Sequence, residues 1–154
     1  MKFLKLTVRS TGLFRELAFL MHKALPVKEK ILLIEDNIDL IEIMRVYLTH
    51  RGYRVLHAQD GFEAIETAGS EIPDLVVMDV MLQDMDGVQI ASELRKHAKT
   101  RHIPILAVTA KTFTDESMPN VFNDILGKPA NLHQFDAKIQ KLLQKFGRKH
   151  PSNQ

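Results

Sequence analysis

Apolar residues along this chain fall into short runs that polar residues, glycines and prolines interrupt. Continuous apolar runs of this length are typical of strands that are buried on both faces. One run alternates partly with polar positions, so we expect it nearer a sheet edge. The pattern predicts five strands, at residues 31–34, 53–57 (the alternating run), 75–78, 105–108 and 125–127.

Between these runs, apolar positions recur at helical spacing. Asp36 or Asn37 is a candidate cap for a first helix over residues 38–48, which Gly52 closes. Further helices are predicted at residues 62–68, ended by Gly69, from 88 to about 97, and from about 131 to 146, ended by Gly147. Strands that alternate with helices indicate an α/β domain with a parallel sheet covered on both faces.

The first 29 residues precede this alternation. Residues 11–25 predict a separate helix with a broad apolar face, which Pro26 ends. A signal peptide is excluded, because Arg15 and Glu16 interrupt the apolar stretch. We therefore divide the chain into an extension with a helix (1–29), one domain (30–146) and a basic tail (147–154).

Composition is that of an ordinary soluble domain, with 45% hydrophobic and 26% charged residues among 154. Cysteine is absent, which excludes thiolate metal sites and fits a reducing compartment, and no apolar run is long enough to span a membrane. We expect a cytoplasmic protein. The net charge of +2 conceals an acidic middle, with a net charge of −6 over residues 30–140, between ends of +4 each.

Polar residues follow four of the predicted strands. Glu35 and Asp36 follow the first, Asp79 the third, Thr109 the fourth and Lys128 the fifth. In a parallel sheet these strand ends share one edge, where ligands of open α/β sheets bind. Any one of the five could be only a cap or a loop residue, but their conjunction predicts a joint site.

Three neighbouring carboxylates repel one another, and a hard divalent cation relieves that repulsion. Mg²⁺ suits the set, because it accepts a few carboxylates and keeps room for a phosphate oxygen. Lys128 and Thr109 offer a cation and a hydroxyl to a phosphoryl group. Asp79 can then act as the nucleophile that forms an aspartyl phosphate.

The chain resembles the receiver domain of response regulators in two-component signalling, over about residues 30–146. The resemblance is carried by four motifs in order: Leu33-Ile34-Glu35-Asp36-Asn37; Asp74-Leu75-Val76-Val77-Met78-Asp79 with Met85-Asp86-Gly87 after it; Val108-Thr109-Ala110; and Gly127-Lys128-Pro129. It implies a flavodoxin-like (βα)5 fold with strand order 2-1-3-4-5.

The resemblance also implies a function. A histidine kinase or a histidine phosphotransfer protein would transfer a phosphoryl group to Asp79, and the domain would then switch a downstream protein partner. Glu35, Asp36 and Asp79, with the backbone carbonyl of Met81, would hold Mg²⁺. Thr109 would be the switch hydroxyl and Lys128 the phosphate-pairing lysine.

Two positions depart from the family pattern. Ile125 stands where the family often has an aromatic residue that follows the switch threonine. The segment 111–124 is short for a full fourth helix and contains Pro119. That face usually carries the output in the family, and a homodimer through it is left open. Only eight residues follow Phe146, so we expect no direct DNA binding.

Three alternatives remain open. The first is a receiver-like interaction module that is never phosphorylated. The second is a phosphatase of the haloacid-dehalogenase type, which requires a second Asp where this chain has Met81. The third is a phosphohistidine at His22 in the N-terminal extension, for which no neighbouring residue gives support.

Overall fold

A computed structural model describes residues 29–113 and 119–147, so the predicted N-terminal helix, His22 and most of the basic tail lie outside the described residues. Five parallel strands form one sheet in the order β2-β1-β3-β4-β5. The strands are β1 (Lys30–Ile34), β2 (Arg54–Ala58), β3 (Leu75–Met78), β4 (Ile105–Thr109) and β5 (Asp124–Gly127). The predicted class and strand order are confirmed, and the partly alternating run is an edge strand.

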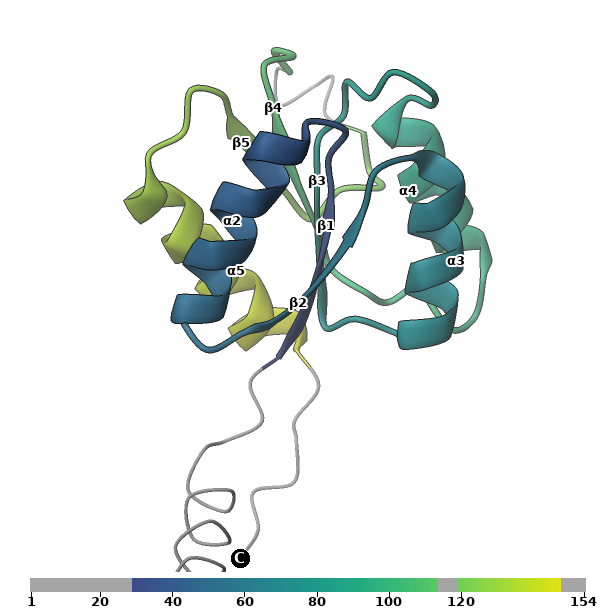
Figure 1. The fold of residues 1–154 in the computed structure, drawn as a ribbon. Helices are drawn as coiled ribbons and strands as arrows, with labels where there is room; N and C mark the ends of the chain where they lie inside the picture. The colour runs from purple at the N-terminus through teal and green to yellow at the C-terminus, as the bar shows by residue number, and fades with distance from the viewer. Residues whose placement is uncertain (1–28, 114–118, 148–154) are drawn as a thin grey trace, which may run out of the picture.

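Four described helices cover the sheet, and Figure 1 shows that both faces are covered. On one face lie α2 (Ile38–His50) and α5 (Leu132–Phe146), and on the other lie α3 (Gly61–Glu71) and α4 (Gly87–Lys96). None of the helices in the described residues is long and apolar enough to cross a membrane.

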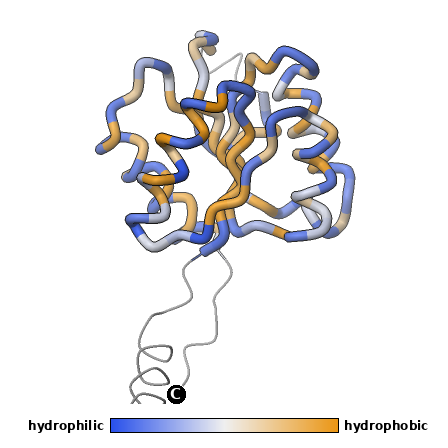
Figure 2. The backbone as a smooth tube through the Cα atoms, viewed as in Figure 1, coloured by the Kyte–Doolittle hydropathy of each residue, from blue (hydrophilic) through white to orange (hydrophobic). Residues whose placement is uncertain are grey.

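The core forms two layers, because successive side chains of a strand point to opposite faces of the sheet. Leu32 and Val76 pack toward α3 and α4, whereas Leu33 and Val77 pack toward α2 and α5. The strands therefore carry the most hydrophobic stretches of the tube in Figure 2. β1, β3 and β4 are almost completely buried, which fixes their carboxyl ends relative to one another.

Each described helix begins at a side chain that accepts a backbone N–H, as the cap predictions require. Asn37, rather than Asp36, caps α2, and its Oδ1 accepts from Leu40 N at 3.1 Å. Asp60, Asp86 and Asn131 cap α3, α4 and α5 in the same way. Because Asn37 provides the cap, the carboxylate of Asp36 is not used to begin the helix.

One predicted helix end is wrong. α3 continues through Gly69 to Glu71 and ends at Ile72, whose φ of 45° is left-handed and whose N–H donates to Ala68 O. A glycine inside a helix costs only about 1 kcal/mol relative to alanine. Burial of Ala64 and Ala68 against the core outweighs that cost.

The connection from β4 to β5 has no helix in its described parts, residues 110–113 and 119–123. The guanidinium of Arg95 on α4 instead holds this segment. It donates to Val121 O at 2.8 and 3.1 Å, and to Asn123 Oδ1 at 2.8 Å. The same group also donates to the carbonyls of Arg101 and Ile103. Residues 114–118 of the segment expected to be short for a helix lie outside the described residues, and Arg95 fastens the described end of the connection to the fold.

Candidate functional site

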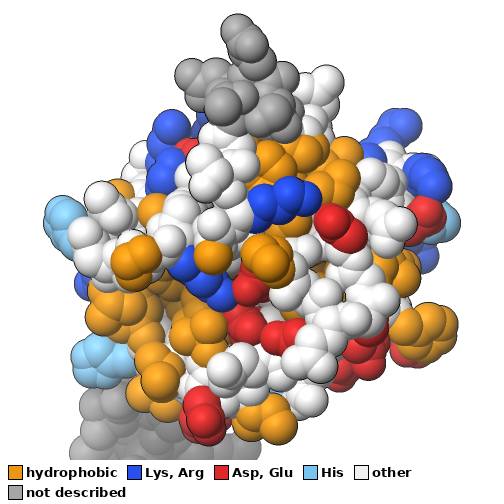
Figure 3. Space-filling model, turned by 90° about the horizontal axis from the view of Figure 1, so that it is seen from above, with side chains coloured by type: hydrophobic (Ala, Val, Ile, Leu, Met, Phe, Trp, Pro, Cys, Tyr) orange, Lys and Arg blue, Asp and Glu red, His pale blue; other side chains and the backbone are white. Residues whose placement is uncertain are grey.

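The carboxyl edge of the sheet gathers the polar residues that follow the strands. Seen from above in Figure 3, acidic side chains lie beside basic ones in a shallow hollow, with hydrophobic side chains around it. Glu35 comes directly after β1, Asp79 directly after β3, and Lys128 directly after β5. β1 and β3 are neighbours, although α2, β2 and α3 separate them in sequence, so the crossover brings Glu35 and Asp79 together.

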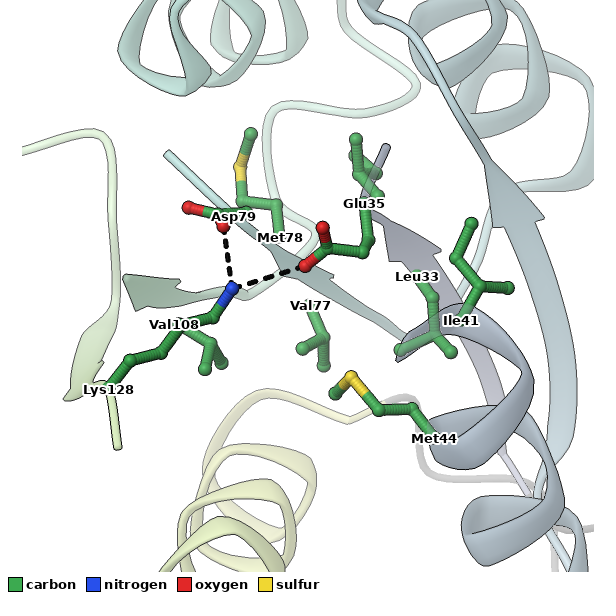
Figure 4. A pocket seen from close by; sticks show the side chains of 10 residues that line it. Leu33, Glu35, Ile41, Met44, Val77, Met78, Asp79, Val108 and Lys128 are labelled. Atoms are coloured by element: carbon green, nitrogen blue, oxygen red, sulfur yellow. Dashed lines mark hydrogen bonds and ion pairs between the residues drawn. The ribbon is translucent and has the colours of Figure 1, made fainter. Parts of the chain in front are cut away.

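Lys128 joins the two carboxylates. Its Nζ lies 2.6 Å from Asp79 Oδ2 and 3.2 Å from Glu35 Oε2 (Figure 4). The side chains of Glu35, Asp79 and Lys128 are 8, 12 and 29% exposed, so these charges are largely withdrawn from water. Apolar side chains that include Val77 and Val108 line the space around this triad.

The pKa of Lys128 reflects two opposing effects. Burial by itself lowers the pKa of the ammonium group, whereas the hydrogen bond to Asp79 and the charges of both carboxylates raise it. The raising effects are larger together, so the pKa of Lys128 lies above its ordinary value. Lys128 is therefore a permanent cation at neutral pH.

Asp79 is fixed by its backbone as well as by Lys128. Its N–H donates to Ile34 O at 2.9 Å, which continues the pairing of β3 with β1 past the end of the strand. Its Oδ1 accepts the N–H of Met81 at 2.9 Å. Both carboxylate oxygens of Asp79 thus have a hydrogen-bond donor, the Met81 N–H on Oδ1 and the Lys128 ammonium on Oδ2.

The loop after Asp79 folds back on itself. Met81 and Asp86 form an isolated antiparallel bridge, and Gly87 N donates to Val80 O at 2.9 Å. A Cβ at Gly87 would lie 2.7 Å from Val80 Cα and 2.9 Å from Asp79 O, so only glycine fits here. The close approach places the first turn of α4 against the residue that follows Asp79.

The two acidic residues Glu35 and Asp36 make different contacts. Glu35 is buried, and its second oxygen accepts the N–H of Asn37 at 3.1 Å. Asp36 is more accessible, and its Oδ2 accepts the N–H of Gln83 at 3.1 Å, which ties the first acidic loop to the loop after Asp79. Asp36 therefore lies beside the loop that carries the Met81 carbonyl, but it is not in the Lys128 triad.

The described residues contain no group of three or more His, Asp or Glu side chains already arranged as a metal site. Two of these carboxylates, Glu35 and Asp79, converge on the ammonium of Lys128. The donor set of three carboxylates and a nearby carbonyl consists of hard oxygens, as Mg²⁺ prefers. The residues present therefore fit Mg²⁺ in their chemistry.

Thr109 is fully buried at the end of β4, and its hydroxyl oxygen accepts the N–H of Lys111 at 3.1 Å. The backbone of Lys128 donates to Thr109 O at 2.9 Å, so β4 and β5 hold the two residues side by side. Ile125 is half-buried and packs in the core with Phe113 and Phe122, whose rings meet edge to face at 6.5 Å. This aromatic pair thus belongs to the same core layer as Ile125.

Lys111 was not singled out in the sequence, yet it lies at this edge. Its Nζ is 3.8 Å from Asp86 Oδ2 and lies over the ring of Phe113 at 5.4 Å. The only signal was its place two residues after Thr109, at the same strand end. Lys111 adds a second positive charge to the rim of the hollow.

Comparison with known proteins gives one consistent result. The family model of the response regulator receiver domain matches residues 31–140. The transcriptional regulatory protein PhoP for alkaline phosphatase synthesis of Bacillus subtilis is 32% identical over 134 residues, a match that covers 83% of this chain and 54% of PhoP. The chain thus spans about half the length of this relative, and of most of the other curated relatives that it matches.

Solved structures that resemble this chain are also response regulator receiver domains. The response regulator TrrA of Thermotoga maritima, determined with Mg²⁺ and BeF, is 27% identical with a TM-score of 0.67, over 75% of this chain and 99% of TrrA. The receiver domain of the sensor histidine kinase PA1611 of Pseudomonas aeruginosa, with a magnesium ion in its active-site cleft, is 30% identical with a TM-score of 0.64, over 77% of this chain and 97% of that domain.

Proposed function

Because the chain belongs to the response regulator receiver domain family, we propose that it accepts a phosphoryl group on Asp79 in two-component signalling. The observation that carries the proposal is the Lys128 ammonium, which touches both Asp79 and Glu35. A lone buried aspartate would need one cation for its charge. Here the cation is shared with a second carboxylate, which leaves the site with surplus negative charge for a metal to neutralise.

The proposed reaction is a transfer between two side chains. A carboxylate oxygen of Asp79 attacks the phosphorus of a phosphohistidine, the N–P bond breaks, and the imidazole leaves with its electron pair. Asp79 then carries a mixed anhydride with phosphate, which water later hydrolyses. The phosphodonor in this proposal is a histidine kinase or a histidine phosphotransfer protein.

Glu35, Asp36 and Asp79 are the carboxylates that would hold Mg²⁺, together with the backbone carbonyl of Met81. The ion would neutralise charge on the phosphoryl oxygens while the phosphoryl group is transferred from the histidine to Asp79. The magnesium ions in the structures of TrrA and PA1611 support this assignment. Of the two acidic residues that follow β1, Glu35 is buried and Asp36 is more accessible, so Asp36 would be the ligand that an ion from solution reaches more easily.

Lys128 and Thr109 would bind the phosphoryl group. The Lys128 side chain already reaches Asp79, so it needs to move only from a carboxylate oxygen to a phosphoryl oxygen. Thr109 would have to give up its bond to the Lys111 N–H and turn its hydroxyl toward the new group. That exchange moves the start of the β4–β5 connection and offers a signal to a downstream protein partner.

The identity of the partners remains a prediction. The homologue PhoP is named as a transcriptional regulator, whereas our expectation for residues 1–154 is a protein partner without direct DNA contact. A homodimer through the β4–β5 side stays open, and cytoplasmic location stays an expectation.

Incubation with acetyl phosphate and Mg²⁺ tests the proposal. We expect the intact mass to rise by one phosphoryl group, in a bond that is labile to base. Asp79→Asn should abolish the gain, and Asp39→Asn, a matched change on the exposed surface of α2, should leave it intact. Gain of phosphate by Asp79→Asn would overturn the assignment of the acceptor.

Ile125 supports a second candidate, an interaction module that is not phosphorylated. Beryllofluoride, which mimics a phosphoryl group, separates the two by amide NMR spectra recorded with Mg²⁺. Shifts at Thr109, Lys111 and Lys128 favour the phospho-acceptor. Unchanged spectra, together with no gain of mass from acetyl phosphate, favour the module.

A further inference from the structure

A groove of about 420 Å³ runs between α3 and α4 at the carboxyl ends of both helices. Helices that cross between parallel strands run opposite to them, as α3 and α4 do in Figure 1. The groove at their carboxyl ends therefore lies at the edge of the sheet opposite Asp79, which follows the carboxyl end of β3. Its accessible surface is mainly apolar and comes from Ile65 and Gly69 on α3 and from the exposed Ala98, two residues after the end of α4, while the fully buried Leu94 lies beneath them. The groove is independent of the phosphorylation site in both position and chemistry.

Gly69 opens the groove. It lies inside α3, where an alanine would be more favourable, and no atom lies within 4 Å of the place where its Cβ would be. The backbone of Gly69 has a helical conformation that does not require glycine. Nothing in the described chain therefore demands a glycine here, whereas close approach of another backbone or side chain would.

The lip of the groove is basic. His97 and Lys99 line it and are exposed, and Glu66 on α3 is the one acid among its lining residues. The stretch 94–103 carries four Lys/Arg and two His with no acid. Lys96 is paired with Glu93 at 2.5 Å, but within the described chain the Lys99 ammonium makes no ion pair. Lys99 thus offers an uncompensated charge at the mouth of an apolar channel.

We propose that this groove, defined by Ile65, Gly69, Leu94, Ala98 and Lys99, binds an acidic amphipathic helix of a partner protein. Apolar side chains of the helix would enter the channel over Gly69. Acidic side chains on its flank would pair with Lys99 and with the exposed Arg101 beyond it. Partner binding here leaves Asp79 at the opposite edge free for its own reaction.

A synthetic helical peptide of about 18 residues, with leucine on one face and glutamate on the other, serves as the probe. Titration into the ¹⁵N-labelled full chain should shift the amides of Gly69, Leu94, Ala98 and Lys99. The same peptide with lysine in place of glutamate should bind weakly or not at all. Equal shifts from both peptides, or shifts confined to other residues, overturn the proposal.

Two variants sharpen the test. Gly69→Leu fills the groove from an open position and improves helix propensity, so it should raise the thermal midpoint while abolishing the peptide-induced shifts. Lys99→Glu should weaken binding by about three- to tenfold at physiological salt. Lys145→Glu, a matched charge reversal at an exposed position on α5, should have little effect. Binding that survives Gly69→Leu would contradict the proposed channel.

Other occupants give different outcomes. If the groove holds a second copy of this chain, the amides of Gly69 and Ala98 should shift with protein concentration alone. If it holds lipid, vesicles of phosphatidylcholine with phosphatidylglycerol should reproduce the shifts and the acidic peptide should not. Either result would overturn the assignment to an acidic helix.

Discussion

Lys128 donates to Asp79 across 2.6 Å, and the two residues are separated by 49 positions in sequence. The ion pair forms only because β5 and β3 deliver their carboxyl ends to the same edge of the sheet, with β4 between them. A lysine in this position serves the folded protein even without phosphate, because it offsets the charges of Asp79 and Glu35.

We expect Lys128→Gln to lower the free energy of unfolding by about 1–3 kcal/mol at neutral pH, since two poorly exposed carboxylates lose their cation. The pKa of Lys128 is raised above 10.5 in the folded state. Its contribution is therefore fully present below the unfolded value and is lost as pH rises through the folded value. Urea unfolding of both proteins should show a constant difference up to about pH 10 that shrinks at higher pH.

The same variant should keep its affinity for Mg²⁺, because the carboxylates remain, but lose the response to beryllofluoride. Lys141→Gln on α5 provides the control for loss of one lysine charge. Wild-type spectral shifts in Lys128→Gln would contradict the role proposed for this lysine.

Gly87→Ala should disturb the site through the backbone. The added methyl group would meet Val80 and Asp79 below 3.0 Å, so the loop must move. We expect a loss of about 1–3 kcal/mol in stability, measured by urea unfolding, and slower phosphorylation by acetyl phosphate. Gly127→Ala, at an open position close to Lys128, provides the matched control. Phosphorylation at the wild-type rate in Gly87→Ala would show that the loop tolerates the shift.

Arg51 and Asp136 link the end of α2 to α5. Arg51 Nη2 lies 2.5 Å from Asp136 Oδ2, and Oδ1 of the nearly buried Asp136 has no hydrogen-bond partner among the described residues. Arg51→Met should cost about 1–3 kcal/mol, because it leaves a carboxylate without its cation. Arg45→Met, which breaks an exposed pair with Glu42, should cost less than about 1 kcal/mol in the same unfolding assay.

A double variant tests whether the unpaired carboxylate of Asp136 causes the loss of stability in Arg51→Met. Arg51→Met combined with Asp136→Leu removes both charges and should recover part of the loss. If the double variant is less stable than Arg51→Met alone, the cost comes from packing rather than from the unpaired carboxylate.

Arg95→Lys should be costly although it keeps the charge. A lysine cannot reproduce the planar fork that binds the carbonyls of Val121, Arg101 and Ile103 together. We expect a loss of about 2–4 kcal/mol by thermal or urea unfolding, with faster hydrogen exchange at Ile105 and Asn123. Lys96→Arg, a reverse change on the same helix, should leave both measurements close to wild type.

Much of this structure could be predicted from the sequence, because buried parallel strands have continuous apolar runs. The convergence of Glu35, Asp79 and Lys128 could be predicted in the same way, since each directly follows a strand. The strand order came from the resemblance to receiver domains rather than from periodicity, which carries no information on which strands are neighbours.

The long-range hydrogen bonds and the exact end of α3 could not be predicted from the sequence. The bond from Gln83 to Asp36 and the reach of Arg95 to Val121 join a side chain to a distant backbone, and any sequence offers the same backbone groups. The end of α3 was predicted at Gly69 because glycine often ends helices. The helix in fact continues three residues further, because Ala68 is buried and the left-handed Ile72 ends it, and only tertiary packing determines this.

The central place of β1, between β2 and β3, has a consequence for biosynthesis. The acidic pair emerges early from the ribosome, but it meets Asp79 only once β3 has joined β1, and Lys128 only after β5 has closed the sheet edge. Contacts between segments so far apart in sequence form late in folding. A nascent or truncated chain that ends before residue 128 therefore has the carboxylates without their cation, so competence for chemistry arises together with completion of the sheet.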